Sequence, residues 1–228
     1  VYTTDPRIVP KAKKLDKITY EEMLEMASLG AKVLQTRSVA MAMSHGVRVQ
    51  VLSSFTNKPG TMVVDEEEIV ENQVVSGITY AKSEAQVTIV GVKNKPGIAS
   101  DVFTLLAQSN INVDMIIQNE TEDGRKTDLT FTVTENDLDK SQEVLKEAKD
   151  IEFDNLITDE NVVKISVVGV GMRSHAGVAA TMFKTLADKG INIQVISTSE
   201  IKISVLIDAE YTELAVRALH TAYGLDVE

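Results

Sequence analysis

Two stretches of this chain each place a glycine at the start of a predicted helix and polar residues on the strand that follows. The first reads KNKPGIASDVFTLLAQSNINVDMIIQN over residues 93–119, and the second reads RSHAGVAATMFKTLADKGINIQVISTSE over residues 173–200. Gly97 of the first stretch corresponds to Gly177 of the second. A chain with such a repeat is expected to build the same small unit twice.

The residues around the first glycine offer groups that could bind a carboxylate and an ammonium group of a small molecule. The Pro96-Gly97 turn leaves backbone N–H groups unpaired at a helix start, where they suit a carboxylate. Gly97 also lets a ligand approach the backbone closely. Asp114 offers a carboxylate to the ammonium group, and Gln118 offers an amide. Because residues two apart on a strand share a face, we expect Asn112, Asp114 and Gln118 to lie together.

The same residues also have a purely structural interpretation. A Pro-Gly pair is a common helix start, and Asn112 and Asn192 both suit the turn before a strand. The residue types alone favour this plainer interpretation, whereas the recurrence of the pattern favours a binding role. Both interpretations stay open at this point.

The chain offers few residues for other kinds of chemistry. Its three histidines, His45, His175 and His220, do not have the spacing of metal ligands. Cysteine is absent, which excludes disulfides, thiolate zinc sites and cysteine nucleophiles. We therefore predict no catalytic residue and no metal site in this chain.

The composition is that of an ordinary globular protein with an aliphatic core. The 228 residues are 43% hydrophobic and 25% charged, and Trp is absent. A formal net charge of −11 argues against nucleic acid or an anionic membrane as a partner, because no excess of cations is available to displace phosphate counterions. No apolar run reaches the roughly 18–20 residues that a membrane helix needs. Since no signal peptide is visible and cysteine is absent, we expect a cytoplasmic location.

Each repeated stretch lies within a predicted β-α-β-β-α unit. The first unit has strands at 85–92, 111–118 and 126–133, and helices at 96–110 and 137–150. The second has strands at 162–170, 191–198 and 201–208, and helices at 177–190 and 210–224. A closing strand would complete the ferredoxin-like β-α-β-β-α-β sandwich, in which both helices cover one face of the sheet. The free edge or face could then pair with another such unit.

The first part of the chain has helix and strand signals of its own. Thr19 and Glu22 form a capping-box pattern that starts a helix ending at Gly30. A second helix over 31–46 and a strand over 47–55 follow. Two helices and one strand cannot form a core, so we expect this segment to complete a sheet whose other strands are missing. Because the chain also begins with Val rather than Met, we expect a fragment of a longer protein.

Several stretches of this sequence resemble bacterial aspartate kinase (aspartokinase). They are the two repeats quoted above, VYTTDPRIVPKAKKLDKITYEEMLEMASLGAKVL at residues 1–34, and STSEIKISVL at residues 197–206. The resemblance covers essentially the whole chain. It implies an α/β (α+β) fold in which the C-terminal part of an amino-acid-kinase domain (1–64) and a linker (65–82) precede two ferredoxin-like ACT domains (83–157 and 158–228).

The resemblance implies that the complete protein transfers the γ-phosphoryl group of ATP, which binds with Mg, to the side-chain carboxylate of aspartate. This reaction is the first step toward lysine, threonine and methionine. The ACT pair would bind threonine, lysine or both and inhibit the kinase by feedback. The family's amino-terminal glycine-rich segment is not present, so we expect this chain alone to be inactive and to hold no cofactor.

The resemblance also assigns nucleotide-binding residues. It places Val1 and Tyr2 on the adenine side, and Arg7, Lys32 and Val33 near the nucleotide. A polyanion needs cationic donors, because electrostatic positioning carries most of phosphoryl transfer. Arg7 and Lys32 are otherwise ordinary surface charges.

For the effector, the resemblance implies a pocket with one wall from each unit. The first wall is Asn94, Lys95, Pro96, Gly97, Ile98, Ala99, Asn112, Val113, Asp114 and Gln118. The second wall is Val178, Ala179, Asn192, Ile193, Ser199 and Glu200. Lysine-sensitive members of the family often have Asp just before Lys-Pro-Gly, where this chain has Asn94. A neutral amide binds an extra ammonium group less well, so threonine alone and threonine with weaker lysine dependence both stay open.

Two other functions stay open as well: a free-standing amino-acid sensor without a kinase, and a purely structural dimerisation module. The kinase-like segment 1–56 argues against a pure sensor, which has no use for half of a nucleotide-binding sheet. We expect a homodimer through the ACT domains or pairing with a catalytic subunit. Neither the identity of the effector nor the oligomeric state follows from the sequence.

Overall fold

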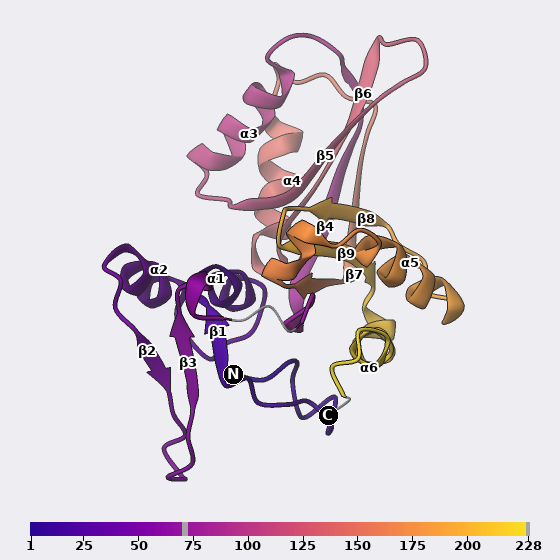
Figure 1. The fold of residues 1–228 in the computed structure, drawn as a ribbon. Helices are drawn as coiled ribbons and strands as arrows, with labels where there is room; N and C mark the ends of the chain where they lie inside the picture. Colours follow the sequence, from indigo (N-terminus) through magenta and orange to yellow (C-terminus); the bar gives the residue numbers. More distant parts are fainter. Residues whose placement is uncertain (70–72, 227–228) are drawn as a thin grey trace. The chain divides into compact units, whose positions relative to one another are not determined.

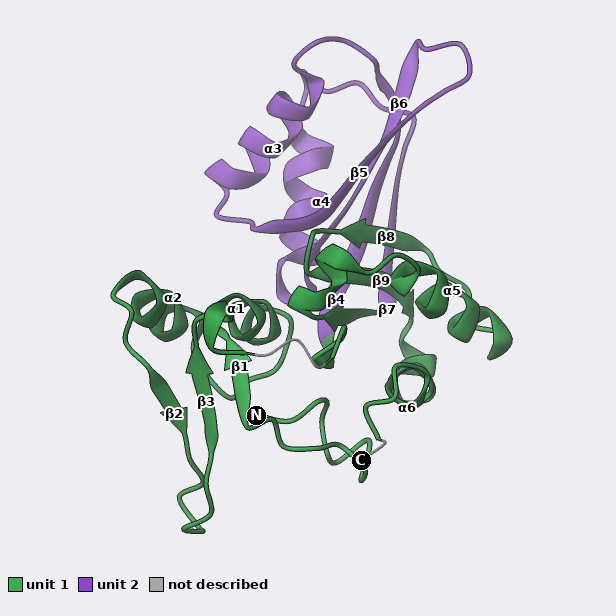
Figure 2. Cartoon of the chain, viewed as in Figure 1, with its two compact units in different colours: residues 1–81, 164–228 green, residues 82–163 purple. Residues whose placement is uncertain are grey.

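The computed structural model describes residues 1–69 and 73–226 and divides the chain into two compact units (Figures 1 and 2). Unit 1 comprises residues 1–81 and 164–228, and unit 2 comprises residues 82–163. Unit 1 is thus built from two separate parts of the sequence, and the sequence of unit 2 lies between them.

Unit 2 has the β-α-β-β-α-β order of a ferredoxin-like fold. Its elements are β4 (Gly77–Lys93), α3 (Ile98–Gln108), β5 (Val113–Glu120), β6 (Lys126–Thr134), η2 (Glu135–Asp137), α4 (Leu138–Glu147) and β7 (Asn155–Val168). The strands lie in the order β5-β6-β4-β7, and β6 is antiparallel to both β5 and β4. β7 is the closing strand that the sequence pattern required. The first residues of β4 and the last residues of β7 belong to unit 1.

The sheet and the two helices of unit 2 enclose a hydrophobic core. Leu129 and Phe131 on β6 meet Val102 and Leu106 on α3 and Leu145 on α4, and all five side chains are fully buried. Leu129 and Phe131 are two residues apart, so they point to the same face of the sheet, which α3 and α4 cover (Figure 1). Burying each such side chain stabilises the fold by roughly 1.5–3 kcal/mol. This packing fixes α3 against the sheet.

Unit 1 contains the second repeat. Its elements are the end of β7, η3 (Val170–Ser174), α5 (Val178–Asp188), β8 (Val195–Thr198), β9 (Lys202–Asp208), η4 (Ala209–Tyr211) and α6 (Thr212–Ala222). The strands lie in the order β7-β9-β8, and the described residues after α6 form turns as far as Asp226. The Ser76 N–H donates to the carbonyl oxygen of Val168 at 2.8 Å, so the chain just before β4 lies beside the end of β7.

The amino-terminal part of unit 1 is a small three-stranded sheet with two helices. Its elements are β1 (Lys17–Thr19), α1 (Tyr20–Ser28), α2 (Thr36–Ser44), β2 (Val49–Val51), β3 (Thr61–Val64) and η1 (Glu66–Glu68). The strand order is β1-β3-β2, with β1 parallel and β2 antiparallel to β3. Tyr20, Met23 and Val63 are buried in one cluster with Val168 of β7. The amino-terminal part and the second repeat therefore share a core within unit 1.

The structure differs from the expected elements in this part of the chain. α2 begins at Thr36 rather than at residue 31, because a turn follows Gly30, whose φ of +107° ends the preceding helix. The segment also contains two strands that the sequence pattern did not predict, β1 and β3, and β3 lies between β1 and β2. That this sheet belongs to a larger one stays a prediction. The sequence pattern missed β1 and β3 because they have only three and four residues, too few to show a clear alternation. The capping box of Thr19 and Glu22 is confirmed.

Candidate functional site

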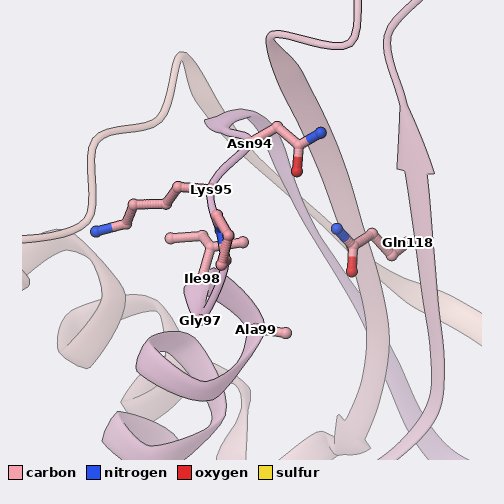
Figure 3. Close-up of a pocket in the computed structure, with 7 residues that line it drawn as sticks. Asn94, Lys95, Gly97, Ile98, Ala99 and Gln118 are labelled. Atoms are coloured by element: carbon pink, nitrogen blue, oxygen red, sulfur yellow. The ribbon is translucent and has the colours of Figure 1, made fainter.

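A cavity of about 430 Å³ lies in unit 2 between the start of α3 and strand β5 (Figure 3). Its lining residues are Asn94, Lys95, Pro96, Gly97, Ile98, Ala99 and Gln118. All of them belong to the set that the resemblance assigned to the effector. The structure therefore brings the loop before α3, the first turn of α3 and one residue of β5 to a single cavity.

Gly97 starts α3 in the left-handed region, with a φ of +93°. This backbone conformation favours glycine, whereas a Cβ at this position would meet no atom within 4 Å. Gly97 contributes no side chain to cap the helix, and the first N–H groups of a helix have no partner within it. The amino terminus of α3 thus presents backbone donors and the positive end of the helix dipole at this cavity.

The other polar side chains of the cavity differ in how firmly they are held. The Asn94 amide donates to Glu120 Oε1 at 3.2 Å and to the carbonyl oxygen of Gly124 at 3.0 Å, so the β5–β6 hairpin fixes its orientation. Lys95 extends away from Gln118 (Figure 3), and its Nζ lies 3.5 Å from Asp101 Oδ2. Asn94 is therefore a fixed amide, while the Lys95 charge is partly offset by its neighbour.

β5 contains a bulge that changes which residues face the cavity. The pairing of β5 with β6 shifts between Asp114 and Ile117, and Met115 has a φ of +46°. The Asp114 carboxylate accepts a hydrogen bond from the Met115 N–H at 2.8 Å, which supports this unusual backbone. A bulge of this kind interrupts the alternation of side chains along a strand.

The register shows the result of the bulge. Gln118 pairs with Leu129, which points into the core, whereas Asp114 pairs with Thr132, which points to the opposite face. The expectation that Asn112, Asp114 and Gln118 share one face is therefore wrong. Of these three, Gln118 lines the cavity as described, and the assignment of Asn112, Val113 and Asp114 to the effector stays a prediction.

Unit 2 contains a second cavity, of about 610 Å³, which Asn94 also lines. Its lining residues are Gly91, Lys93, Asn94, Gly124, Arg125, Lys126, Glu152, Phe153 and Asp154. Lys126 Nζ lies 2.6 Å from both carboxylate oxygens of Asp154. No sequence pattern predicts this cavity, because its residues come from the end of β4, the β5–β6 turn with the start of β6, and the segment before β7, which share no motif.

The predicted effector residues of the second repeat lie in unit 1. Gly177 has a φ of +96° and starts α5, so Val178 and Ala179 occupy the same place in the repeat as Ile98 and Ala99. Asn192 and Ile193 lie between α5 and β8, and Ser199 and Glu200 lie between β8 and β9.

Their environment resembles that of the first repeat in one respect. Glu200, like Glu120, interacts with a residue before the glycine-started helix: its Oε2 lies 3.4 Å from Arg173 Nε. The Tyr223 hydroxyl donates to the Val178 carbonyl oxygen at 2.8 Å, which ties α6 to the start of α5.

The predicted nucleotide residues also lie in unit 1. Arg7 is exposed and forms a bidentate pair with Asp5, with Nη2 to Oδ2 at 2.7 Å and Nε to Oδ1 at 3.0 Å. The Arg7 guanidinium, through these hydrogen bonds, lowers the pKa of Asp5 to about 2. Val1 is buried and Tyr2 is half exposed. Lys32 and Val33 lie in the exposed turn between α1 and α2.

Within residues 1–69 and 73–226, no group of three or more His, Cys, Asp or Glu side chains is arranged to hold a metal ion. The same residues include no helix that is long and apolar enough to span a membrane. Of the three histidines, His220 is buried, and its Nε2 lies 2.9 Å from Thr3 Oγ1.

The sequence matches known protein families over three parts of the chain. Residues 86–153 and residues 165–223 each match the ACT domain, and residues 1–53 match the amino acid kinase family. The aspartate kinase of Pseudomonas putida is 55% identical over 228 residues, which are 99% of this chain and 55% of that protein.

A solved structure of aspartokinase alpha and beta subunits is 49% identical, with a TM-score of 0.61, over 66% of this chain and 99% of that chain. The chain belongs to the aspartate kinase family. Another aspartate kinase, E. coli aspartokinase III in complex with lysine and aspartate, has a TM-score of 0.78 at 27% identity, over 98% of this chain and 49% of that chain. The present chain spans about half the length of the curated aspartate kinases it matches. The predicted fold class, two ACT domains after an amino-acid-kinase fragment, is confirmed.

Proposed function

We propose that this chain is the regulatory portion of an aspartate kinase that binds threonine, alone or with lysine, and thereby inhibits the kinase. The observation that carries this proposal is the cavity at the start of α3, where a helix amino terminus and the Gln118 amide line the same space. Support also comes from E. coli aspartokinase III, whose structure was solved with lysine and aspartate.

The cavity suits the two charged groups of an amino acid in different ways. The α-carboxylate would accept hydrogen bonds from the backbone N–H groups at the start of α3. The α-ammonium group would donate to side-chain oxygens such as that of Gln118. A volume of about 430 Å³ is within the range of pockets for small ligands.

The lining favours threonine over lysine. The seven described residues around this cavity include no carboxylate, and their one charged side chain is the cation of Lys95. A second ammonium group, on the side chain of lysine, would therefore lack an anionic partner, whereas the threonine hydroxyl needs only an amide or backbone group. Lysine would then bind this cavity more weakly than threonine, or would inhibit only together with threonine.

The catalytic part of the proposal concerns the complete protein. It would transfer the γ-phosphoryl group of ATP to the side-chain carboxylate of aspartate, toward lysine, threonine and methionine. Val1 and Tyr2 would contact adenine, and Arg7, Lys32 and Val33 would lie near the phosphates, with Arg7 as a charge-assisted donor. We assign no magnesium ligand to this chain, and we propose that the chain alone is inactive.

Inhibition would operate through a shift between two arrangements of the ACT domains. An effector that binds one arrangement more tightly increases the population of that arrangement. The equilibrium constant between the two arrangements changes by no more than the ratio of the effector's affinities for them. The ACT domains would pair with a second copy of this chain or with a catalytic subunit, and the change in their arrangement would alter the kinase through that contact.

Calorimetric titration of the chain with threonine, with lysine and with both tests the effector. We expect threonine to bind, and Gln118→Ala to weaken its binding by roughly 3–10-fold, as the loss of one hydrogen bond predicts. A saturating effector at 100 times its dissociation constant should also stabilise the fold by about 2.7 kcal/mol.

Gln108→Ala is the matched control, because Gln108 is an exposed amide at the far end of α3. It should leave the threonine affinity unchanged. If the titrations show no binding heat for threonine or for lysine, the proposal is contradicted and a structural module is favoured. Tight threonine binding that Gln118→Ala does not weaken would place the effector outside this cavity.

A further inference from the structure

The segment that carries the predicted nucleotide residue Arg7 is held by the start of β4 and by α6 of the second repeat. This segment, residues 1–9, receives a hydrogen bond from the Ile78 N–H to the Thr3 carbonyl oxygen at 2.7 Å. His220 on α6 contacts the Thr3 hydroxyl at 2.9 Å, and Arg217 Nε on α6 donates to the Ile8 carbonyl oxygen at 3.0 Å. All these residues belong to unit 1, so the contacts lie within one compact unit.

Tyr80, on the first part of β4, reaches Arg7 through Asp5. Its hydroxyl donates to Asp5 Oδ2 at 2.9 Å, and the same carboxylate binds Nε and Nη2 of Arg7. The Asp5 side chain is only 15% exposed, whereas the Arg7 side chain is 86% exposed. Asp5 is thus the fixed member of the pair, and the nitrogen Nη1 of Arg7 is the one that Asp5 does not engage.

Holding Arg7 in this way has an energetic consequence for a ligand. A free arginine side chain loses rotamer entropy when a ligand immobilises it, which weakens binding. Because Asp5 already restricts the guanidinium of Arg7 and Tyr80 restricts Asp5, a phosphate that binds Nη1 would meet a side chain that is already ordered.

The backbone of Tyr80 packs against the second part of the predicted nucleotide site. Gly30 ends helix α1 just before the turn with Lys32 and Val33, and a Cβ at Gly30 would collide with the carbonyl oxygen of Tyr80. The first residues of β4 are therefore in contact with both chain segments that carry predicted nucleotide residues.

We infer that Tyr80 is a positioning residue of the nucleotide site. The Tyr80 hydroxyl orients Asp5 and, through it, Arg7, and the Tyr80 backbone supports the turn at Lys32. The inference rests on the proposed function, because it takes these residues as nucleotide contacts. It adds that the strand leading into the ACT domains is part of the nucleotide site's support. A displacement of the start of β4 would then change the affinity for ATP directly.

A double-mutant cycle in the complete protein tests this inference. Tyr80→Phe removes the hydroxyl and keeps the ring, and we expect it to raise both the dissociation constant and the KM for MgATP by roughly 3–10-fold, with kcat within about twofold. Arg7→Ala should weaken MgATP binding more. Adding Tyr80→Phe to Arg7→Ala should have no further effect, because Tyr80 acts through Arg7.

Tyr211→Phe is the matched control, since the neighbouring Glu210 carboxylate raises the pKa of Tyr211 and both residues lie outside residues 1–9. It should leave MgATP binding unchanged, and melting temperatures show whether each variant is folded. If Arg7→Ala does not weaken MgATP binding, the nucleotide assignment of the proposed function fails. If Arg7→Ala weakens binding but Tyr80→Phe does not, or if Tyr80→Phe acts equally without Arg7, the inference is overturned while the proposed function stands.

Discussion

Glu22 shows how one residue can serve both local and long-range structure. Its Oε2 accepts hydrogen bonds from the backbone N–H and the hydroxyl of Thr19, both at 3.1 Å, which completes the capping box of α1. Its Oε1 accepts hydrogen bonds from the Ser76 hydroxyl and, at 3.0 Å, from the Val170 N–H. The side chain is only 2% exposed, so the carboxylate is buried and fully used.

Glu22→Ala should destabilise the fold by about 2–4 kcal/mol, because it leaves several buried donors without an acceptor. Glu21→Ala, in the same first turn of α1 but on a partly exposed residue, should change stability by less than about 0.5 kcal/mol. Urea denaturation of both variants measures the difference. Equal losses for the two variants would show that the long-range contacts of Glu22 contribute nothing.

Asp5 is expected to make stability depend on pH. Hydrogen bonds from Arg7 lower its pKa to about 2 in the folded protein, against about 3.9 in an unfolded chain. The folded state therefore gains stability from the ionised Asp5 above about pH 4, and loses it as the pH falls toward 2. Carbon NMR titration of Asp5 should give the low pKa, and Arg7→Ala should raise it toward 3.9. A titration that Arg7→Ala leaves unchanged would contradict the pairing.

At the scale of the elements, the glycine that ends α1 and the glycine that starts α3 both have a positive φ but have different surroundings. Gly30 and Gly97 have φ values of +107° and +93°. A Cβ at Gly97 would enter open space, whereas a Cβ at Gly30 would meet the backbone of Tyr80. Their substitutions should therefore separate backbone strain from steric conflict.

Gly97→Ala should destabilise unit 2 by about 1–2 kcal/mol, the strain of a left-handed non-glycine residue alone. Gly30→Ala adds a clash with Tyr80 and should destabilise unit 1 by about 3 kcal/mol or more. Thermal and urea unfolding compare the two variants. A loss at Gly30 no larger than that at Gly97 would mean that the start of β4 can move away from the end of α1.

The elements also show where periodicity was informative. The helices over Ile98–Gln108 and Val178–Asp188 follow from their spaced apolar residues and glycine starts. The strand over Lys126–Thr134 follows from alternation, and the strand over Lys202–Asp208 follows from a short apolar run that includes β-branched residues. The bulge in β5 has no such mark, because Met115 is not a residue that sequence reasoning would place at a positive φ. That one bulge decides that Gln118, and not Asp114, lies on the helix-covered face.

At the scale of the whole molecule, one of the two units is built from two separate stretches of the sequence. The amino-terminal part and the second repeat form unit 1, and the first repeat, residues 82–163, forms unit 2. Residues that are distant in sequence therefore meet within unit 1, such as Glu22 with Val170 at a separation of 148 and Asp5 with Tyr80 at a separation of 75. This arrangement gives the second repeat its contacts with the kinase-like segment.

The sequence by itself determined the family, the duplicated unit and the helix starts, because these depend on motifs, periodicity and local capping, which act over a few residues. The candidate effector loop at Asn94–Gly97 follows from the same local signals. Only the tertiary structure decided that Asp114 and Gln118 lie on opposite faces of β5, that β1 and β3 belong to one sheet, and that Tyr80 holds Asp5. Those outcomes depend on strand register and on contacts between distant segments, which no local pattern in the chain encodes.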